Sequence, residues 1–116
     1  RDLQNADGQW TRAKGYDSFC PLGPWIATHI DLEEAGRLDL LTSLNDEPVQ
    51  AANTALMVHP IAELVAYVTS FTTLLPGDVI LTGTPAGVGP MVPGDRVSVT
   101  ISGIGTLTNP VIAEEA

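Results

Sequence analysis

The carboxyl-terminal part of the chain alternates between apolar and polar residues. Over residues 96–102, valine or isoleucine occupies positions 97, 99 and 101, and serine or threonine occupies positions 98, 100 and 102. This two-residue period predicts a strand with one buried and one exposed face. The glycines within 103–105 predict a turn that leads into a second strand at 106–112.

Four further segments have the composition of strands, and two of them are joined by a turn. Residues 38–44 and 48–52 are short apolar runs on either side of Asn-Asp-Glu at 45–47, so we predict a hairpin. The apolar run at 79–82 predicts a strand that is buried on both sides. Residues 25–30, which follow a proline-containing apolar segment, predict another strand.

Residues 59–75 have the periodicity of an amphipathic helix. Apolar side chains recur at spacings of three and four and therefore share one face: Ile61, Leu64, Val65, Val68 and Phe71. The helix must end before Pro76, because proline supplies no backbone donor and disfavours helical geometry at the preceding residue. We therefore predict an α+β fold, mostly β, with one main helix packed on the sheet.

Composition and charge limit the function. The chain of 116 residues is 44% apolar, which is enough for one domain with a modest core. Its net charge of −9 argues against binding nucleic acid or an anionic membrane, and no run approaches the roughly 18 apolar residues of a membrane span. A small anionic substrate fits better, because Arg1, Arg12 and Lys14 lie close together in the sequence.

The single cysteine, Cys20, cannot form an intramolecular disulfide, which favours a reducing compartment such as the cytoplasm. It lies in an apolar stretch without a nearby histidine or aspartate, so we interpret it as a core residue and not as a nucleophile. The chain begins at Arg1 without an initiator methionine or a signal peptide, and we therefore expect 1–116 to be part of a larger domain.

The loop Leu-Thr-Gly-Thr-Pro-Ala-Gly-Val-Gly at 81–89 follows a predicted strand and carries no charge. It lacks the lysine and the glycine order of nucleotide-binding loops. One interpretation is a tight turn that requires left-handed backbone geometry. The other is a ligand site, because glycine allows close approach to the backbone and Thr84 offers a hydroxyl and an N–H group to a carboxylate.

The residues that could bind a metal are scattered. His29 and His59 are thirty residues apart, and no paired-cysteine or paired-histidine motif is present. A metal site made from this chain alone is therefore not predicted. Arg1, Gln4 and Lys14 are long side chains that donate hydrogen bonds, as a site for a dicarboxylate or β-dicarbonyl requires, although each of them singly is also typical of a solvated surface.

Four long segments resemble the carboxyl-terminal catalytic domain of the fumarylacetoacetate hydrolase family. They are Arg-Asp-Leu-Gln at 1–4 and the stretches 9–25, 63–89 and 93–111, which occur in the family's order over nearly the whole chain. The chain departs from the family at 45–50, where a simple Asn-Gly turn is common, and at His59, which is often aromatic. The resemblance implies the family's mixed β-sandwich roll.

The resemblance also implies a metal-dependent enzyme. Family members hold Mg²⁺ or Mn²⁺ with two glutamates of an E-x-E motif and an aspartate, an oxygen set suited to a hard cation. By position, these ligands are expected upstream of Arg1. Arg1 and Gln4 are similar to the substrate-contacting arginine and glutamine, Lys14 to the lysine beside the metal, and Thr84 to the threonine that faces the substrate's carboxylate. Arg1 and Lys14 are the implied catalytic residues.

The implied reaction is hydrolysis of a carbon–carbon bond in a β-diketo acid such as an acylpyruvate or fumarylpyruvate. Alternatives are isomerase or decarboxylase chemistry on 2-oxo or 2-hydroxymuconate-type acids in aromatic catabolism, and a module that binds carboxylates without turnover. The lid base that would separate these reactions is expected outside this chain. Family members are commonly homodimers, and the resemblance implies the same here.

Overall fold

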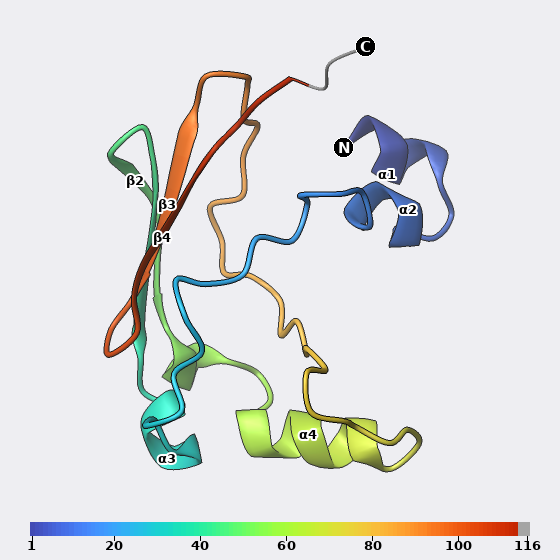
Figure 1. The fold of residues 1–116 in the computed structure, drawn as a ribbon, viewed down its shortest axis with the longest axis vertical. Helices are drawn as coiled ribbons and strands as arrows, with labels where there is room; N and C mark the ends of the chain where they lie inside the picture. The colour runs from blue at the N-terminus through green and yellow to red at the C-terminus, as the bar shows by residue number, and fades with distance from the viewer. Residues whose placement is uncertain (114–116) are drawn as a thin grey trace.

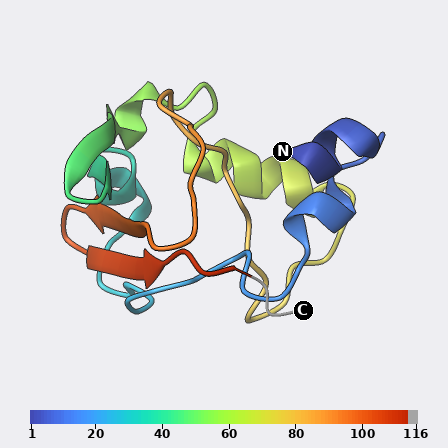
Figure 2. The same ribbon diagram turned by 90° about the horizontal axis from the view of Figure 1, so that it is seen from above.

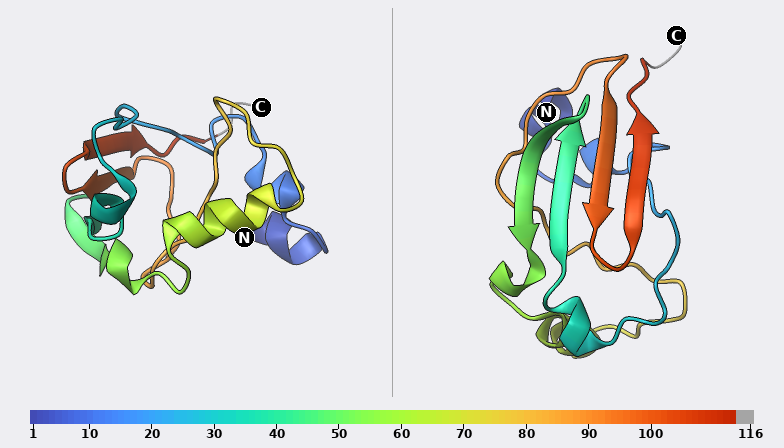
Figure 3. Two further views of the ribbon diagram at one scale, coloured as in Figure 1. Left: turned by 90° about the horizontal axis from the view of Figure 1, so that it is seen from below. Right: turned by 90° about the vertical axis from the view of Figure 1, so that its left-hand side faces the viewer.

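The computed structural model describes residues 1–113 and consists of one antiparallel sheet with short helices around it (Figure 1). From its position at the end of the chain we also expect the tail at 113–116 to fray, and this expectation falls almost wholly on residues outside the described ones. The sheet has the strand order β2-β1-β3-β4, and Figure 3 shows the four strands side by side. The strands are β1 (Asp39–Leu44), β2 (Glu47–Asn53), β3 (Arg96–Ile101) and β4 (Gly105–Pro110). The helices are α1 (Asp2–Ala6), α2 (Thr11–Lys14), α3 (Leu32–Ala35), the 3₁₀ helix η1 (Thr54–Leu56) and α4 (Ile61–Thr69).

The α+β class, mostly β, is therefore confirmed. Strands β1 and β2 form the predicted hairpin, in which Leu44 pairs with Glu47. Its two turn residues, Asn45 and Asp46, have left-handed φ angles of 51° and 71°. Asparagine and aspartate tolerate this geometry better than other non-glycine residues, which explains why they lie between the two apolar runs.

The second hairpin is also confirmed, although β4 ends at Pro110 and is shorter than predicted. Strands β3 and β4 pair in antiparallel register, with Val99 opposite Leu107. On their polar face the hydroxyl groups of Thr100 and Thr106 lie 2.8 Å apart and those of Ser98 and Thr108 lie 2.9 Å apart. The alternation of the sequence thus appears as one face of hydroxyl pairs and one face of aliphatic side chains.

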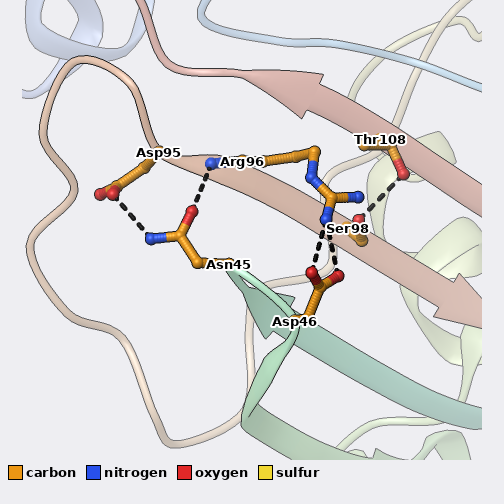
Figure 4. Close-up of polar contacts among 6 residues, drawn as sticks. All are labelled: Asn45, Asp46, Asp95, Arg96, Ser98 and Thr108. Atoms are coloured by element: carbon orange, nitrogen blue, oxygen red, sulfur yellow. Dashed lines mark hydrogen bonds and ion pairs between the residues drawn. The ribbon is translucent and has the colours of Figure 1, made fainter.

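The two hairpins join through β1 and β3, which pair from Leu40 opposite Ile101 to Leu44 opposite Val97. A polar network closes the far end of this pairing (Figure 4). The Arg96 backbone N–H donates to Asn45 Oδ1 over 2.9 Å, and Asn45 Nδ2 donates to Asp95 Oδ1 over 2.8 Å. The Arg96 guanidinium pairs with Asp46, its Nη2 lying 2.6 Å from Oδ2.

Helix α4 is shorter than the predicted helix at 59–75. It begins after Pro60 and ends at Thr69, where side-chain hydroxyls compete for backbone carbonyl groups. Thr69 Oγ1 donates to the carbonyl of Val65 over 2.9 Å, and Ser70 Oγ donates to that of Tyr67 over 2.7 Å. The prediction that this helix packs on the sheet was wrong in detail, because α4 lies beside α3 at one end of the sheet (Figure 1).

Two predicted strands are absent from the described structure. Residues 25–30 and 79–82 are extended but belong to no sheet, and the side chains of Ile26 and Leu81 are 90% and 73% exposed. A strand buried on both sides needs neighbours on its edges and faces, and residues 1–113 provide none for these segments. Gly105 nevertheless has the Trp25 ring beside it, so that the segment around 25 lies near the beginning of β4.

Most apolar side chains of the chain are not buried. Ala13 and Leu38 are the buried apolar residues among those described, and the accessible surface is 9078 Å². A compact monomer of this mass exposes about 6,100 Å² by the usual scaling of area with mass. The prediction that Cys20 lies in a core was also wrong, because Cys20 is exposed together with its apolar neighbours Phe19 and Leu22.

The exposed apolar surface predicts the behaviour of the chain in isolation. The 116-residue polypeptide by itself should bind the dye ANS strongly and unfold over a broad range of urea, with an apparent m value below about 1 kcal/mol/M. Dye fluorescence and a urea titration followed by circular dichroism measure both properties. A sharp two-state transition without dye binding would contradict this expectation.

The network of Figure 4 predicts the titration of Asp95. The hydrogen bond from Asn45, and after it the one from the Val92 backbone, lowers the pKa of Asp95 below its ordinary value of 3.8. We predict that Asn45→Ala raises this pKa, measured by NMR titration of the carboxyl carbon. Because a lowered pKa stabilises the folded state above the unfolded-state pKa, the stability lost in the variant should diminish as the pH falls below about 3.8. An unchanged Asp95 titration would contradict the assigned cause.

Candidate functional site

Arg1 and Gln4 lie together at the beginning of the chain. Gln4 is in α1, three residues after Arg1, and this spacing places both side chains on one face of the helix. Arg1 Nη1 donates a hydrogen bond to Gln4 Oε1 over 3.3 Å. The contact uses the acceptor oxygen of Gln4 and leaves its amide N–H groups as donors toward a ligand.

Lys14 is the last residue of α2, and its ammonium group lies 5.2 Å from the centre of the Trp10 ring. The neighbouring Arg12 is already engaged, because its guanidinium binds both carboxylate oxygens of Asp7 at 2.7 and 2.9 Å. This hydrogen bonding raises the pKa of Arg12. Within residues 1–113, neither Arg1 nor Lys14 pairs with a carboxylate. These two cations therefore remain free to bind an anion.

The loop at 81–89 contacts the edge strand β2. Gln50 Nε2 donates to Thr84 Oγ1 and to the carbonyl oxygen of Pro85, each over 3.0 Å. Three residues later, Gly87 has a left-handed φ of 103°, and a methyl group added there would overlap the carbonyl oxygen of Val49. The loop thus needs glycine at 87 for its backbone angle, as the tight-turn interpretation predicted, and also because the backbone of β2 lies against it. The close approach of a ligand that the sequence suggested stays a prediction.

A cavity of about 360 Å³ lies beside Thr84. Strands β1 and β2, η1 and the beginning of α4 surround it together with the loop, and its lining is mostly apolar, with Leu40, Leu56 and Leu64 among the lining residues. At its rim, His59 Nδ1 lies 3.5 Å from Glu63 Oε2, and both side chains are largely exposed. The cavity offers an apolar wall next to the polar groups of the loop.

The structure places the four predicted site residues in two groups. Arg1 directly precedes α1, Gln4 belongs to α1 and Lys14 to the adjacent α2, whereas Thr84 contacts Gln50 of the sheet. The cavity beside Thr84 is not lined by Arg1, Gln4 or Lys14. Figures 1 and 2 show the segment that carries the loop running between the sheet on one side and α1 and α2 on the other. The contacts of the described residues thus join Arg1 to Gln4 and Thr84 to Gln50, and none of them joins one group to the other.

The donor groups within the described residues are too scattered to form a metal site. No three side chains of histidine, cysteine, aspartate or glutamate in residues 1–113 gather closely enough to hold an ion. The pair His59 and Glu63 supplies two donors and is exposed to solvent. The described residues therefore do not fit a site for Mg²⁺ or Mn²⁺ on their own, since such ions need about six oxygen ligands.

Sequence reasoning missed Gln50. The sequence places Gln50 in the strand at 48–52 of the predicted hairpin and within a departure from the family's usual turn. Neither observation singles it out, because a polar residue on an edge strand is ordinary. The contact of Gln50 with Thr84 joins residues that are 34 positions apart.

None of the helices described in residues 1–113 has the length and apolar character needed to cross a bilayer.

Comparison with known proteins identifies the family. The model of the fumarylacetoacetate (FAA) hydrolase C-terminal domain matches residues 1–112, and the chain belongs to this family. Protein Rv2993c of Mycobacterium tuberculosis is 58% identical over 112 residues, which are 97% of this chain and 42% of that protein. The chain thus spans somewhat less than half the length of this relative.

Two solved structures show which proteins share the fold. A 5-carboxymethyl-2-hydroxymuconate delta-isomerase from Mycobacterium smegmatis is 54% identical and has a TM-score of 0.93, covering 100% of this chain and 45% of that chain. A maleylpyruvate hydrolase from Sphingobium sp. SYK-6, in complex with manganese(II) and pyruvate, is 43% identical with a TM-score of 0.79, covering 84% of this chain and 37% of that chain. The family thus includes an isomerase and a hydrolase among the proteins most similar to this chain.

Two glycines of the loop provide a matched test of its geometry. We predict that Gly87→Ala destabilises the full-length protein by about 1–3 kcal/mol, because a side chain there is strained at positive φ and meets the Val49 carbonyl group. Gly89→Ala should change stability by less than about 0.5 kcal/mol, since nothing lies within 4 Å of an added methyl group. Urea denaturation of both variants measures the difference. Equal effects would mean that the loop does not rest on β2.

Proposed function

We propose that this chain forms part of the active site of a hydrolase that cleaves a carbon–carbon bond in a β-diketo acid such as an acylpyruvate or fumarylpyruvate. The observation that supports it best is the pair of cations without carboxylate partners within residues 1–113, Arg1 and Lys14, in a member of the fumarylacetoacetate hydrolase family. The structural relative that carries the name maleylpyruvate hydrolase, and that holds pyruvate, supports the same class of substrate.

The proposal includes a divalent cation, Mg²⁺ or Mn²⁺, in the full-length protein. The family resemblance implies that the ligands, an aspartate and an E-x-E pair, lie upstream of Arg1, and residues 1–113 hold no cluster of three suitable donors. The manganese(II) in the maleylpyruvate hydrolase relative is consistent with this choice. When bound, the cation supplies a Lewis acid that polarises a carbonyl group of the substrate.

The residues of this chain would bind the substrate and stabilise negative charge. Arg1 can hold a carboxylate with two parallel hydrogen bonds, and Lys14 can donate to the enolate oxygen that develops as the carbon–carbon bond breaks. Gln4, whose Oε1 accepts from Arg1, orients that guanidinium and offers its N–H groups to the substrate. On the opposite side, Thr84 would present its hydroxyl to a carboxylate oxygen. The uncharged loop thus supplies shape and donors, while the cations supply charge.

Isomerase or decarboxylase chemistry is the second candidate. It is favoured by the delta-isomerase from Mycobacterium smegmatis, which covers the whole of this chain at 54% identity. Hydrolysis and isomerisation both pass through an enolate of a 2-oxo acid, so Arg1 and Lys14 would stabilise the same charge in either case.

A third candidate is a module that binds carboxylates without turnover. It differs from the two enzyme candidates because it would bind a ligand but convert none.

Two further properties are proposed for the full-length protein. Many large apolar side chains are exposed, and the accessible surface of the whole chain is 9078 Å². This exposure supports burial against further protein surface, and we propose a homodimer. An exposed free thiol at Cys20 is better tolerated where thiols are kept reduced, which supports the cytoplasm.

Substitution of Lys14 tests the proposed function. In the full-length protein with Mg²⁺ or Mn²⁺, we predict that Lys14→Met lowers kcat for an acylpyruvate by about 10²–10³-fold, as expected for the loss of one donor to a developing oxyanion. Arg37→Met is the matched control, because Arg37 pairs only with Glu33 on the exposed surface, 3.2 Å away.

The same assay separates the candidates. Pyruvate formation from an acylpyruvate supports the hydrolase, whereas isomerisation of 5-carboxymethyl-2-hydroxymuconate without that activity supports the isomerase. If the wild-type protein binds pyruvate but turns over neither compound with either metal, both enzyme proposals are wrong and the binding module is supported. If Lys14→Met and Arg37→Met behave alike, the role given to Lys14 is wrong.

A further inference from the structure

Strand β2 carries an irregularity at Val49. Thr42 of β1 pairs with Gln50, and Ser43 pairs with Pro48, so that Val49 has no partner and forms a bulge. β2 is at the edge of the sheet, where bulges commonly redirect a neighbouring side chain. The residue that follows the bulge is Gln50. Its side chain is half-buried and reaches the loop instead of extending into solvent.

The hydrogen bonds define the orientation of the Gln50 amide. The carbonyl oxygen of Pro85 is purely an acceptor, so the group 3.0 Å from it must be the Nε2 donor of Gln50 and not its oxygen. The same Nε2 lies 3.0 Å from Thr84 Oγ1, which therefore accepts. Because a hydroxyl oxygen that accepts from an amide retains its own hydrogen, the Thr84 O–H is left to donate elsewhere.

We propose that Gln50 is a positioning residue that holds the Thr84 hydroxyl as a hydrogen-bond donor for a carboxylate oxygen of the bound 2-oxo acid. This inference rests on the proposed function, which brings such a ligand to Thr84. The ligand is an acceptor only, and a threonine hydroxyl free to rotate would spend part of its time with the hydrogen directed away. The two bonds from one amide also fix the backbone at Pro85, so the loop holds Thr84 in one place before the ligand arrives.

The contact of Gly87 with Val49 supports this arrangement independently. At this point the loop lies so close to the backbone of β2 that no side chain fits. The loop is therefore attached to β2 at two places, through the Gln50 side chain and through direct backbone contact at Gly87.

Substitution of Gln50 by glutamate keeps the size of the side chain but, when the glutamate is ionised, replaces the amide donor with a charged acceptor. The carboxylate would take the Thr84 hydrogen for itself and would repel the Pro85 carbonyl oxygen.

The experiment measures binding of pyruvate to the full-length protein with Mn²⁺, by calorimetry at pH 7. We expect Gln50→Glu to weaken binding at least tenfold and Gln50→Met, which has no donor and no charge, to weaken it about three- to tenfold. Lowering the pH toward about 4.5 should recover part of the affinity of Gln50→Glu relative to wild type, because a protonated glutamate can donate again. Gln9→Glu, which adds the same charge at an exposed residue without a side-chain hydrogen bond among the described residues, should bind as wild type does.

Thr84→Val separates failure of this inference from failure of the proposed function. We expect the valine variant to bind pyruvate weakly and Gln50→Met to have no further effect in that background. If Thr84→Val binds weakly while both Gln50 variants bind as wild type does, the positioning role is wrong and the proposed function stands. If Thr84→Val itself binds normally, the role of Thr84 in the proposed function is wrong, and this inference is overturned with it. A Gln50→Met effect that persists undiminished in the Thr84→Val protein would also overturn the inference.

Discussion

The pairing of β1 with β3 is the interaction on which the rest of the structure depends. Each hairpin can form from neighbouring residues, but a two-stranded hairpin alone is marginal in water. β1 and β3 bring together segments more than fifty positions apart, with Leu40 opposite Ile101, and produce a four-stranded sheet. The network of Asn45, Asp95 and Arg96 closes one end of this pairing. With β1 held in the centre, β2 becomes an edge strand, and its outer side is available to the loop that carries Thr84.

The second constraint is that this sheet does not bury its apolar side chains within the described residues. Ala13 and Leu38 are the buried apolar residues among them, and the long connection between β2 and β3, which contains η1 and α4, leaves leucines such as Leu56, Leu75 and Leu81 exposed. The proposed site has the same character. Arg1 lies just before α1, Lys14 ends α2 and Thr84 lies on the loop beside β2. No three side chains of histidine, cysteine, aspartate or glutamate in residues 1–113 gather to hold a metal ion. The exposed apolar surface and the missing metal ligands both agree with a chain that spans less than half the length of these relatives.

Sequence reasoning succeeded where a local rule was sufficient. The two hairpins follow from alternation and from turn residues such as Asn45 that accept left-handed geometry, and the helix follows from apolar spacing. It failed for 79–82, because an apolar run becomes a strand only when another strand pairs with it. It also failed for Cys20, since burial depends on a neighbour that covers it. Of the site, Thr84 was predicted from a family resemblance, whereas Gln50 carries no signal until the loop is seen against β2.

The sequence by itself therefore determined the α+β class, the positions of both hairpins and the main helix, and the family. These properties depend on spacing, turn chemistry and composition, which are local or additive. The tertiary structure decided the rest. It brought Gln50 to Thr84 and Gly87 to the Val49 carbonyl, and it paired Arg12 with Asp7 while leaving Lys14 beside Trp10. Such contacts join one particular atom to another, and their energies depend on distances that the linear order of residues does not contain.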